Sequence, residues 1–282
     1  MNNTIQEISL KELHPFKNHP FQVDDNEELR ELARSIQENG VLTPAMVRPR
    51  VSGGYELISG HRRKSACEIA GLEVMPVIVR DLDDSEAVII MVDSNQQREH
   101  LLPSEKAFAY KMKLDAIKKQ GQRNDLTSAQ VAPKLAAERI GDDSNISKDQ
   151  VKRYIRLTHL IPQILQMVDD KVMAFGPAVK VSFLPKALQD ILLEAMELYQ
   201  CTPSLSQAMQ LKAMNKAGNL DSGQIYEILS KAKGNQQDKV CISIDRLKQF
   251  FPKGYTPKQI EKSILKILEA WKEQRKSIKE IP

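Results

Sequence analysis

Residues 56–68 read Glu-Leu-Ile-Ser-Gly-His-Arg-Arg-Lys-Ser-Ala-Cys-Glu: a short apolar strand that passes through Gly60 into three consecutive cations at the start of a predicted helix. A helix N-terminus already carries about half a positive charge, so cations in its first turn are unfavourable unless an anion lies nearby. Gly60 lets the backbone turn there, and the N–H groups that follow can point at phosphate oxygens. The pattern fits a phosphate site, and equally surface cations paired with Asp or Glu.

The first hundred residues predict an α/β domain. Acidic residues at 24–28 open a helix whose apolar face ends at Gly40, and Pro76 predicts an edge or irregular strand over 74–79. A helix over about 85–92 places Asn95 and Arg98 just beyond its end. The other expected elements are strands over 45–48 and 55–59 and the cationic helix from Arg62 to Gly71.

Length and charge suggest several domains and a polyanionic partner. The chain has 282 residues, which favours two or three domains: 1–100, 101–230 and a C-terminal segment over 235–282. Net charge is −6 over residues 1–100, +5 over 101–156, −2 over 157–230 and +7 over 231–282. A polyanion should therefore meet the two basic blocks. No apolar run or N-terminal pattern indicates a membrane span or signal peptide, so we expect a cytoplasmic protein and no membrane partner.

The second part is predicted to be helical and to include a helix-turn-helix over about 131–157. A long helix is expected from a Ser104 cap to Gly121, followed by helices over 131–141 and 147–157 with a turn over 142–145. A capping box formed by Ser147 and Gln150 marks the start of the last helix. The side chains left for its outer face are those of a recognition helix or of a solvated basic surface: Lys148, Gln150, Lys152, Arg153 and Arg156.

The C-terminal segment combines a short strand with an amphipathic helix. A strand is expected over 240–244, and Thr256 and Gln259 predict a second capping box. The helix that follows presents an apolar stripe, which either packs onto this segment or mediates self-association. The stripe consists of Ile260, Ile264, Ile267, Leu268 and Trp271.

Two short motifs resemble those of the ParB-type partition proteins. Gly60–Ala66 is similar to the family's Gly-Glu-Arg-Arg box, and Ser94–Glu99 to its Glu-Asn-x-Gln-Arg-Glu box, followed by Leu102–Ala107 where the family has Leu-x-Pro-x-Glu-x-Ala. Residues 29–36 and 40–44 resemble a further family box. The similarity extends from about residue 13 to about residue 172.

The resemblance implies a small ParB/sulfiredoxin-like α/β domain, a mostly helical helix-turn-helix domain and a small helical C-terminal segment, hence an α+β fold. It also implies binding of CTP with Mg²⁺. The implied nucleotide-binding residues are Thr43, Gly60, Arg62, Arg63, Asn95 and Arg98, with Asn95 also assigned to Mg²⁺. The family's two acidic residues are replaced by His61 and Ser94, so we expect binding with at most weak CTPase activity, and we assign no catalytic residue.

The expected function is sequence-specific binding of double-stranded DNA in chromosome, plasmid or mobile-element partition, as a CTP-regulated clamp associated with the nucleoid. A homodimer on a palindromic site is expected, because two-fold symmetry lets each recognition helix meet one half-site. A ParA-type ATPase is the further partner that the resemblance implies.

Two alternatives stay open. One is a nucleotide-using enzyme, because the N-terminal fold that the resemblance implies is similar to that of sulfiredoxin. Gly60, however, stands where that enzyme's reactive cysteine would be, and Cys67 lies about two turns away. A transcriptional regulator with a degenerate nucleotide site is the other. The isolated histidines His14, His19, His100 and His159 show no ligand spacing and receive no role.

Overall fold

The computed structural model describes residues 4–96, 98, 101–124, 132–231, 250–251, 255–256, 259–260, 262–264 and 266–267, and the side chains of these except residues 121–124 and 132–136. The chain divides into two compact units, Met1–Lys231 and Ala232–Pro282. Within the described residues, no helix has the length and apolar character needed to cross a bilayer. The strand expected over 240–244, together with Leu268 and Trp271, lies outside the described residues.

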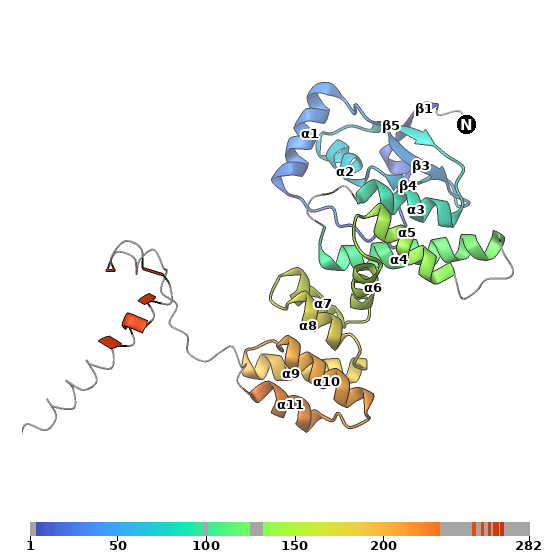
Figure 1. Ribbon diagram of the computed structural model, residues 1–282. Coiled ribbons are helices and arrows are strands. Elements are labelled where there is room, and N and C mark those ends of the chain that lie inside the picture. The colour runs from blue at the N-terminus through green and yellow to red at the C-terminus, as the bar shows by residue number, and fades with distance from the viewer. Residues whose placement is uncertain are drawn as a thin grey trace, which may run out of the picture. The chain divides into compact units, whose positions relative to one another are not determined.

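The first unit begins with a mixed sheet and continues as helices (Figure 1). Its strands are β1 (Ile5–Ser9), β2 (Leu13–Pro15), β3 (Ala45–Pro49), β4 (Tyr55–Ser59) and β5 (Val74–Val79), and a 3-10 helix, η1 (Leu10–Glu12), joins β1 to β2. Its helices are α1 (Glu27–Asn39), α2 (His61–Ile69), α3 (Asp84–Asn95), α4 (Pro103–Asn124), α5 (Ala132–Asp143), α6 (Lys148–Leu157), α7 (Pro162–Asp169), α8 (Phe175–Val181), α9 (Lys186–Tyr199), α10 (Leu205–Lys216) and α11 (Ser222–Ser230). The predicted α+β class is confirmed.

The sheet has the order β1-β5-β3-β4-β2. β1 pairs with β5 and β3 with β4 in antiparallel fashion, whereas β3 pairs with β5 and β2 with β4 in parallel. Of the two alternatives predicted for residues 74–79, an edge or an irregular strand, the edge position is wrong, because β1 pairs with the outer side of β5. Pro76 is accommodated since β3 pairs only with Val77–Val79, beyond the proline that lacks an N–H.

Helix α1 packs beside α2, and its apolar side joins the core of the sheet domain. Leu29, Ala33 and Ile36 recur at helical spacing and are buried, and they join a core that includes Val47 and Leu57. The Asn26 side chain caps α1 by accepting from Leu29 N at 3.0 Å. Gly40 ends the helix with φ 71°. The helix predicted between the acidic residues and Gly40 is thus confirmed.

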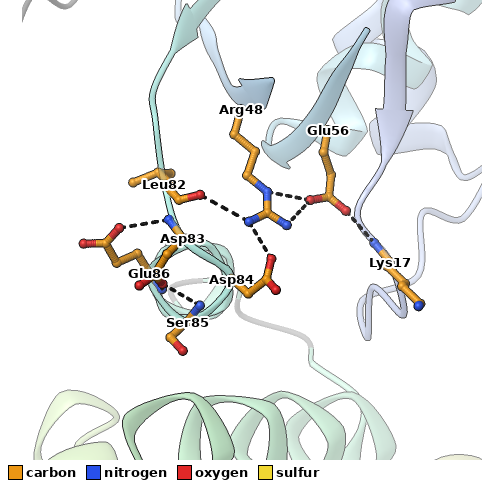
Figure 2. Close-up of polar contacts among 8 residues, drawn as sticks. All are labelled: Lys17, Arg48, Glu56, Leu82, Asp83, Asp84, Ser85 and Glu86. Atoms are coloured by element: carbon orange, nitrogen blue, oxygen red, sulfur yellow. Dashed lines mark hydrogen bonds and ion pairs between the residues drawn. The ribbon is translucent and has the colours of Figure 1, made fainter. Parts of the chain in front are cut away.

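Arg48 joins α3 to the sheet through ion pairs with a largely buried Glu56 and an exposed Asp84 (Figure 2). Arg48 of β3 lies 2.6 Å from a carboxylate oxygen of Glu56 on β4 and 2.8 Å from one of Asp84 at the start of α3. The second oxygen of Glu56 accepts from Lys17 N, while Asp83 caps α3 with a complete capping box. These contacts set the direction of α3, whose other end carries Asn95.

Helices α7–α11 share an apolar core centred on residues such as Leu192 and Ile225. Gln189 is fully buried and replaces missing backbone partners: its side-chain oxygen accepts from Ile161 N, and its amide nitrogen donates to the carbonyls of His159 and Leu184. A buried polar side chain is stable when its hydrogen bonds are satisfied in this way.

Several predicted helix ends are wrong. α3 continues to Asn95, which was expected just beyond a helix ending near residue 92. α4 begins at Pro103, so Ser104 is a helical residue whose N–H donates to Asp169 on α7, and the helix continues through Gly121 to Asn124. α5 also extends two residues past Gly141, so Asp142 and Asp143, which were expected in the turn, belong to the helix. In α4 and α5 the glycine is followed by residues that continue the helical hydrogen bonding, and a single Gly costs a helix only about 1 kcal/mol.

Candidate functional site

Gly60 makes the connection from β4 to α2 possible. It is the N-cap of α2 with φ 107°, and a Cβ built on it would lie 2.8 Å from the Cβ of Ala45. Only glycine fits this left-handed conformation and this close approach. The first turn of α2 is thereby held against the start of β3.

The three cations after His61 have different surroundings. Arg62 forms an ion pair with Glu28 of α1 at 3.1 Å, and Lys64 forms one with Glu68 at 2.6 Å. Arg63 instead donates to the backbone carbonyls of Thr43 and Pro44, the latter at 2.8 Å. Acidic partners are therefore present for two of the cations, while Arg63 anchors the segment before β3 and brings Thr43 to the α2 N-terminus.

Asn95 and Arg98 of the second sequence motif lie at and just beyond the end of α3. Asn95 is the last residue of α3, and its side-chain amide donates to Met91 O at 2.8 Å. Arg98 N donates to Asn95 O. Burial lowers the pKa of the His19 ring, and the nearby charge of Arg98 lowers it further. Since His19 in turn contacts His61, the structure brings the two sequence motifs together around His19.

His19 and His61 form a stacked pair that sequence inspection missed. Their ring centroids lie 3.7 Å apart with 32° between the planes, and both Nε2 atoms are buried without a hydrogen-bond partner among the described residues. Burial, the neighbouring His19 and Lys64 lower the pKa of His61 to about 3. His19 shows no ligand spacing, and His61 stands out in the sequence only as part of the Gly60 motif, so only the fold could reveal the pair.

The described residues do not supply a Mg²⁺ site of their own. None of their His, Cys, Asp and Glu side chains gather in a group of three or more suited to a metal. A hard cation prefers several oxygen ligands, and His61 and Ser94 contribute no carboxylate. Asn95 offers at most one amide oxygen, so its assignment to Mg²⁺ stays a prediction.

The connection between α5 and α6 is a tight turn. Ile146 N donates to Gly141 O at 2.9 Å, and a Cβ on Gly141 would lie 2.6 Å from Ile146 O. Asn145 adopts φ 56°, in the left-handed region that asparagine tolerates. Ile146 and Val151 pack in one cluster, on either side of the cap as in a hydrophobic staple, and Ser147 caps α6.

The five residues predicted for DNA binding are not equivalent. Lys152 and Arg153 are exposed on α6. Lys148 is tied to Glu138 of α5 at 2.7 Å, and Gln150 accepts from Arg153 at 3.1 Å instead of completing the predicted capping box. Arg156 is half-buried, since it donates to Ser182 O at 2.6 Å and stacks on Phe183 of the segment after α8.

Lys113 of α4 is a buried cation between the last turn of α3 and the end of α5. Its side chain is 1% exposed, and Nζ contacts Asp93 of α3 and, at 2.7 Å, Asp143 of α5. Asp93 lies two residues before Asn95, and Asp143 lies at the end of the first helix of the α5–α6 pair. Sequence inspection missed this residue because a lone lysine on a helix face ordinarily points to solvent.

Cys67 lacks the character of a reactive thiol. It is a residue of α2 that is fully buried in the core of the sheet domain, and burial raises its pKa. A nucleophilic cysteine needs access and thiolate character. This weakens the sulfiredoxin-like alternative.

Comparison with known proteins identifies the N-terminal domain. The family model of the ParB N-terminal domain matches residues 1–96. The chain is 34% identical over 183 residues to the "Probable chromosome 1-partitioning protein ParB" of Deinococcus radiodurans, covering 65% of this chain and 57% of that protein. It is 32% identical over 173 residues to the "Stage 0 sporulation protein J" of Bacillus subtilis, covering 61% and 55%. The chain thus spans little more than half the length of these curated relatives.

A solved structure of C-terminally truncated ParB from Caulobacter crescentus, "complexed to the centromeric parS site", matches 80% of this chain and 100% of that chain with 23% identity and a TM-score of 0.43. The matched family domain contains the Gly60 motif and the end of α3, and the matched stretches of both relatives are longer than that domain. Residues 1–96 therefore form a ParB N-terminal domain, and the resemblance to the ParB-type partition proteins is confirmed.

Proposed function

We propose that this chain is a sequence-specific DNA-binding partition protein whose clamping on DNA is regulated by CTP. The observation that carries the proposal is the α5–α6 pair: a tight turn and a capped second helix with Lys152 and Arg153 exposed, in one compact unit with a ParB N-terminal domain. The relatives from Deinococcus and other bacteria carry chromosome-partitioning names, which supports the same role.

In this proposal Arg153 and Lys152 meet base edges and Lys148, Gln150 and Arg156 lie nearer the phosphates or support α6. A base-edge contact contributes about 1 to 3 kcal/mol of discrimination. Arg153→Ala should therefore weaken operator binding about tenfold or more while binding to random DNA changes little. Arg34→Ala, an exposed arginine of α1, is the matched control. Equal loss on operator and random DNA would show that α6 contacts only phosphates.

The proposed nucleotide site lies at the N-terminus of α2, between Thr43, Gly60 and the cations, with Asn95 and Arg98 completing it. Arg62 is the cation to test, because its only described partner is the exposed Glu28, whereas Arg63 holds the backbone of Thr43 and Pro44. Arg62→Ala should abolish the heat of CTP binding and keep the circular dichroism spectrum. Arg30→Ala, exposed on α1 and paired with Asp25, should change neither. No binding of CTP, ATP or GTP by the wild type would remove the nucleotide function.

Slow turnover is part of the proposal. His61 and Ser94 carry no negative charge to hold Mg²⁺ or orient water, so the protein should bind CTP and release phosphate very slowly. His61→Glu with Ser94→Glu should raise the rate. If the wild type with its DNA site releases phosphate as fast as an ordinary ParB protein assayed beside it, this interpretation of the two substitutions is wrong.

A homodimer on a palindromic site, association with the nucleoid and a ParA-type ATPase partner belong to the same proposal. Sequencing the DNA recovered with the protein from cells tests it directly. A few sharp palindromic peaks with spreading flanks support the partition clamp. Scattered promoter peaks would instead support a transcriptional regulator.

A further inference from the structure

The stacked histidines belong to the proposed nucleotide site, at the first turn of α2 and near Arg98. His61 occupies the first turn of α2, next to Arg62, and His19 comes from the loop after β2, outside both sequence motifs. The 3.7 Å separation of their rings leaves two buried Nε2 atoms without partners among the described residues. Buried polar atoms are nearly always satisfied, so an unsatisfied pair at a candidate site indicates a missing contact.

The hydrogen bonding of His19 fixes which of its nitrogens can accept a proton. Nδ1 lies 2.8 Å from the carbonyl oxygen of Phe21, and a carbonyl only accepts, so Nδ1 carries the hydrogen. The Nε2 atom of the neutral ring is therefore a bare lone pair. Adding a proton there turns Nε2 into a donor and keeps the Phe21 bond.

The groups facing the pair keep it neutral without a ligand. Burial lowers the pKa of His19, with the Phe21 bond acting in the opposite direction and the Arg98 charge lowering it further. For His61, burial is followed by His19 and by Lys64 of the same helix. Glu28 of α1 is engaged by Arg62. The rings thus face cations, and the charged form of either ring lacks an anion among the described residues.

An anion satisfies this arrangement better than a metal ion does. In-plane lone pairs of two face-stacked rings run nearly side by side and do not converge on one ion, and the neighbouring cations repel a metal. A phosphate among Arg98, Lys64 and the α2 N-terminus would instead favour protonation of an adjacent imidazole. His19 is the ring suited to it, because its Nδ1 bond already favours the charged form whereas the pKa of His61 is about 3.

We propose that His19 is part of the phosphate-binding surface and takes up one proton from solvent at Nε2 when nucleotide binds, with neutral His61 stacked on its ring. The new N–H donates to a phosphate oxygen. This inference rests on the proposed nucleotide function and extends it to pH regulation: CTP binding strengthens as pH falls, by at most about tenfold per pH unit for one proton.

Titration calorimetry of the full chain with CTP and Mg²⁺ tests the inference. At one pH near 6.5, the heat of CTP binding is measured in buffers of different ionisation enthalpy. The slope of binding heat against buffer ionisation enthalpy gives the number of protons taken up. The terminal phosphate of CTP itself titrates in this range, so the informative quantity is the slope of the wild type minus that of His19→Asn. The asparagine side chain keeps a donor for Phe21 and cannot take up a proton. His159→Asn, at an exposed histidine between α6 and α7 and outside the proposed site, is the matched control.

The expected difference is an uptake approaching one proton in the wild type and in His159→Asn that is lost in His19→Asn. Equal slopes in wild type and His19→Asn overturn the inference. NMR of the wild-type histidine side chains gives an independent readout if the variant does not fold: Nε2 of His19 must become protonated on adding CTP, and a His19 that stays neutral overturns the inference as well.

Failure of the nucleotide function gives a different result. If the wild type shows no heat with CTP, inorganic triphosphate is titrated in its place. Proton uptake at His19 with that anion would support the histidine site and reject CTP as its ligand. Absence of binding by both would reject the histidine site together with the nucleotide function.

Discussion

Replacing Lys113 by Met should destabilise the first unit by about 3 kcal/mol. Met keeps the length and apolar contacts of the lysine stem but removes a charge that is 1% exposed and contacts two carboxylates. Removing one partner of a buried ion pair costs about 3 to 5 kcal/mol, because the remaining charge is left uncompensated. The carboxylates of Asp93 and Asp143 are 45% and 42% exposed and can rehydrate, so the lower end of that range applies.

Urea unfolding followed by circular dichroism measures this loss as a lower midpoint at unchanged slope. Lys111→Met is the matched control, since Lys111 is exposed on the same helix and its replacement should stay within about 0.5 kcal/mol. In a background with Asp93→Asn and Asp143→Asn, Lys113→Met should cost less by about 1 to 3 kcal/mol, the coupling expected for residues in contact. A Lys113→Met variant as stable as Lys111→Met would refute the view that this cation holds the three helices together.

Three further predictions concern single positions. Gly60→Ala should lower the free energy of unfolding, measured by thermal unfolding, by about 2 to 3 kcal/mol, because of φ 107° and the 2.8 Å approach to Ala45. Gly71→Ala, at φ 75° with open space around the added Cβ, should lower it by about 1 kcal/mol. Equal losses in the two variants would contradict the packing argument. Gln189→Leu should cost about 2 to 4 kcal/mol by leaving one buried N–H and two carbonyls unpaired, and a neutral effect in urea would contradict that. His61 has a pKa of about 3 in the folded chain against 6.5 in the unfolded chain, so the unfolded chain binds more protons below pH 6.5. The free energy of unfolding should therefore fall as pH drops from 6.5 towards 3, by at most about 1.4 kcal/mol per pH unit. His61→Gln should flatten this pH dependence, and an unchanged dependence would mean that groups other than His61 cause it.

The local elements were predictable where periodicity and turn chemistry agree. α1 between its acidic start and Gly40, the strand–glycine–helix passage at Gly60 and the capped start of α6 at Ser147 all follow from neighbouring residues. β1 and β2 were missed because short strands without alternating apolar residues give little signal, and β1 decides that β5 is internal. Helix ends at Ser104 and Gly121 were misplaced because tertiary contacts, such as Ser104 N to Asp169, override weak local preferences.

The candidate site was predictable only in its sequence-local part. Gly60, Arg62 and Arg63 are adjacent in sequence, so a helix start brings them together without knowledge of the fold. His19 and Lys113 act through partners at least 20 residues away, His61 for one and Asp93 and Asp143 for the other. No spacing rule connects such residues, and each looks like an ordinary surface side chain in isolation.

Lys113 links the end of α3, next to the proposed nucleotide site, to α5 of the proposed DNA-binding helix pair. Arg48 fixes the first turn of α3 to the sheet through Asp84, while Lys113 holds its last turn through Asp93 and holds α5 through Asp143. A nucleotide that shifts the last turn of α3 would shift Asp93 with it, and a single buried ammonium group cannot keep short contacts with two carboxylates that move apart. DNA that moves the end of α5 would disturb the same cation from the other side. Because coupling between two ligands is reciprocal, we expect any effect of nucleotide on DNA affinity to be matched by DNA on nucleotide affinity, with Lys113 as the shared element.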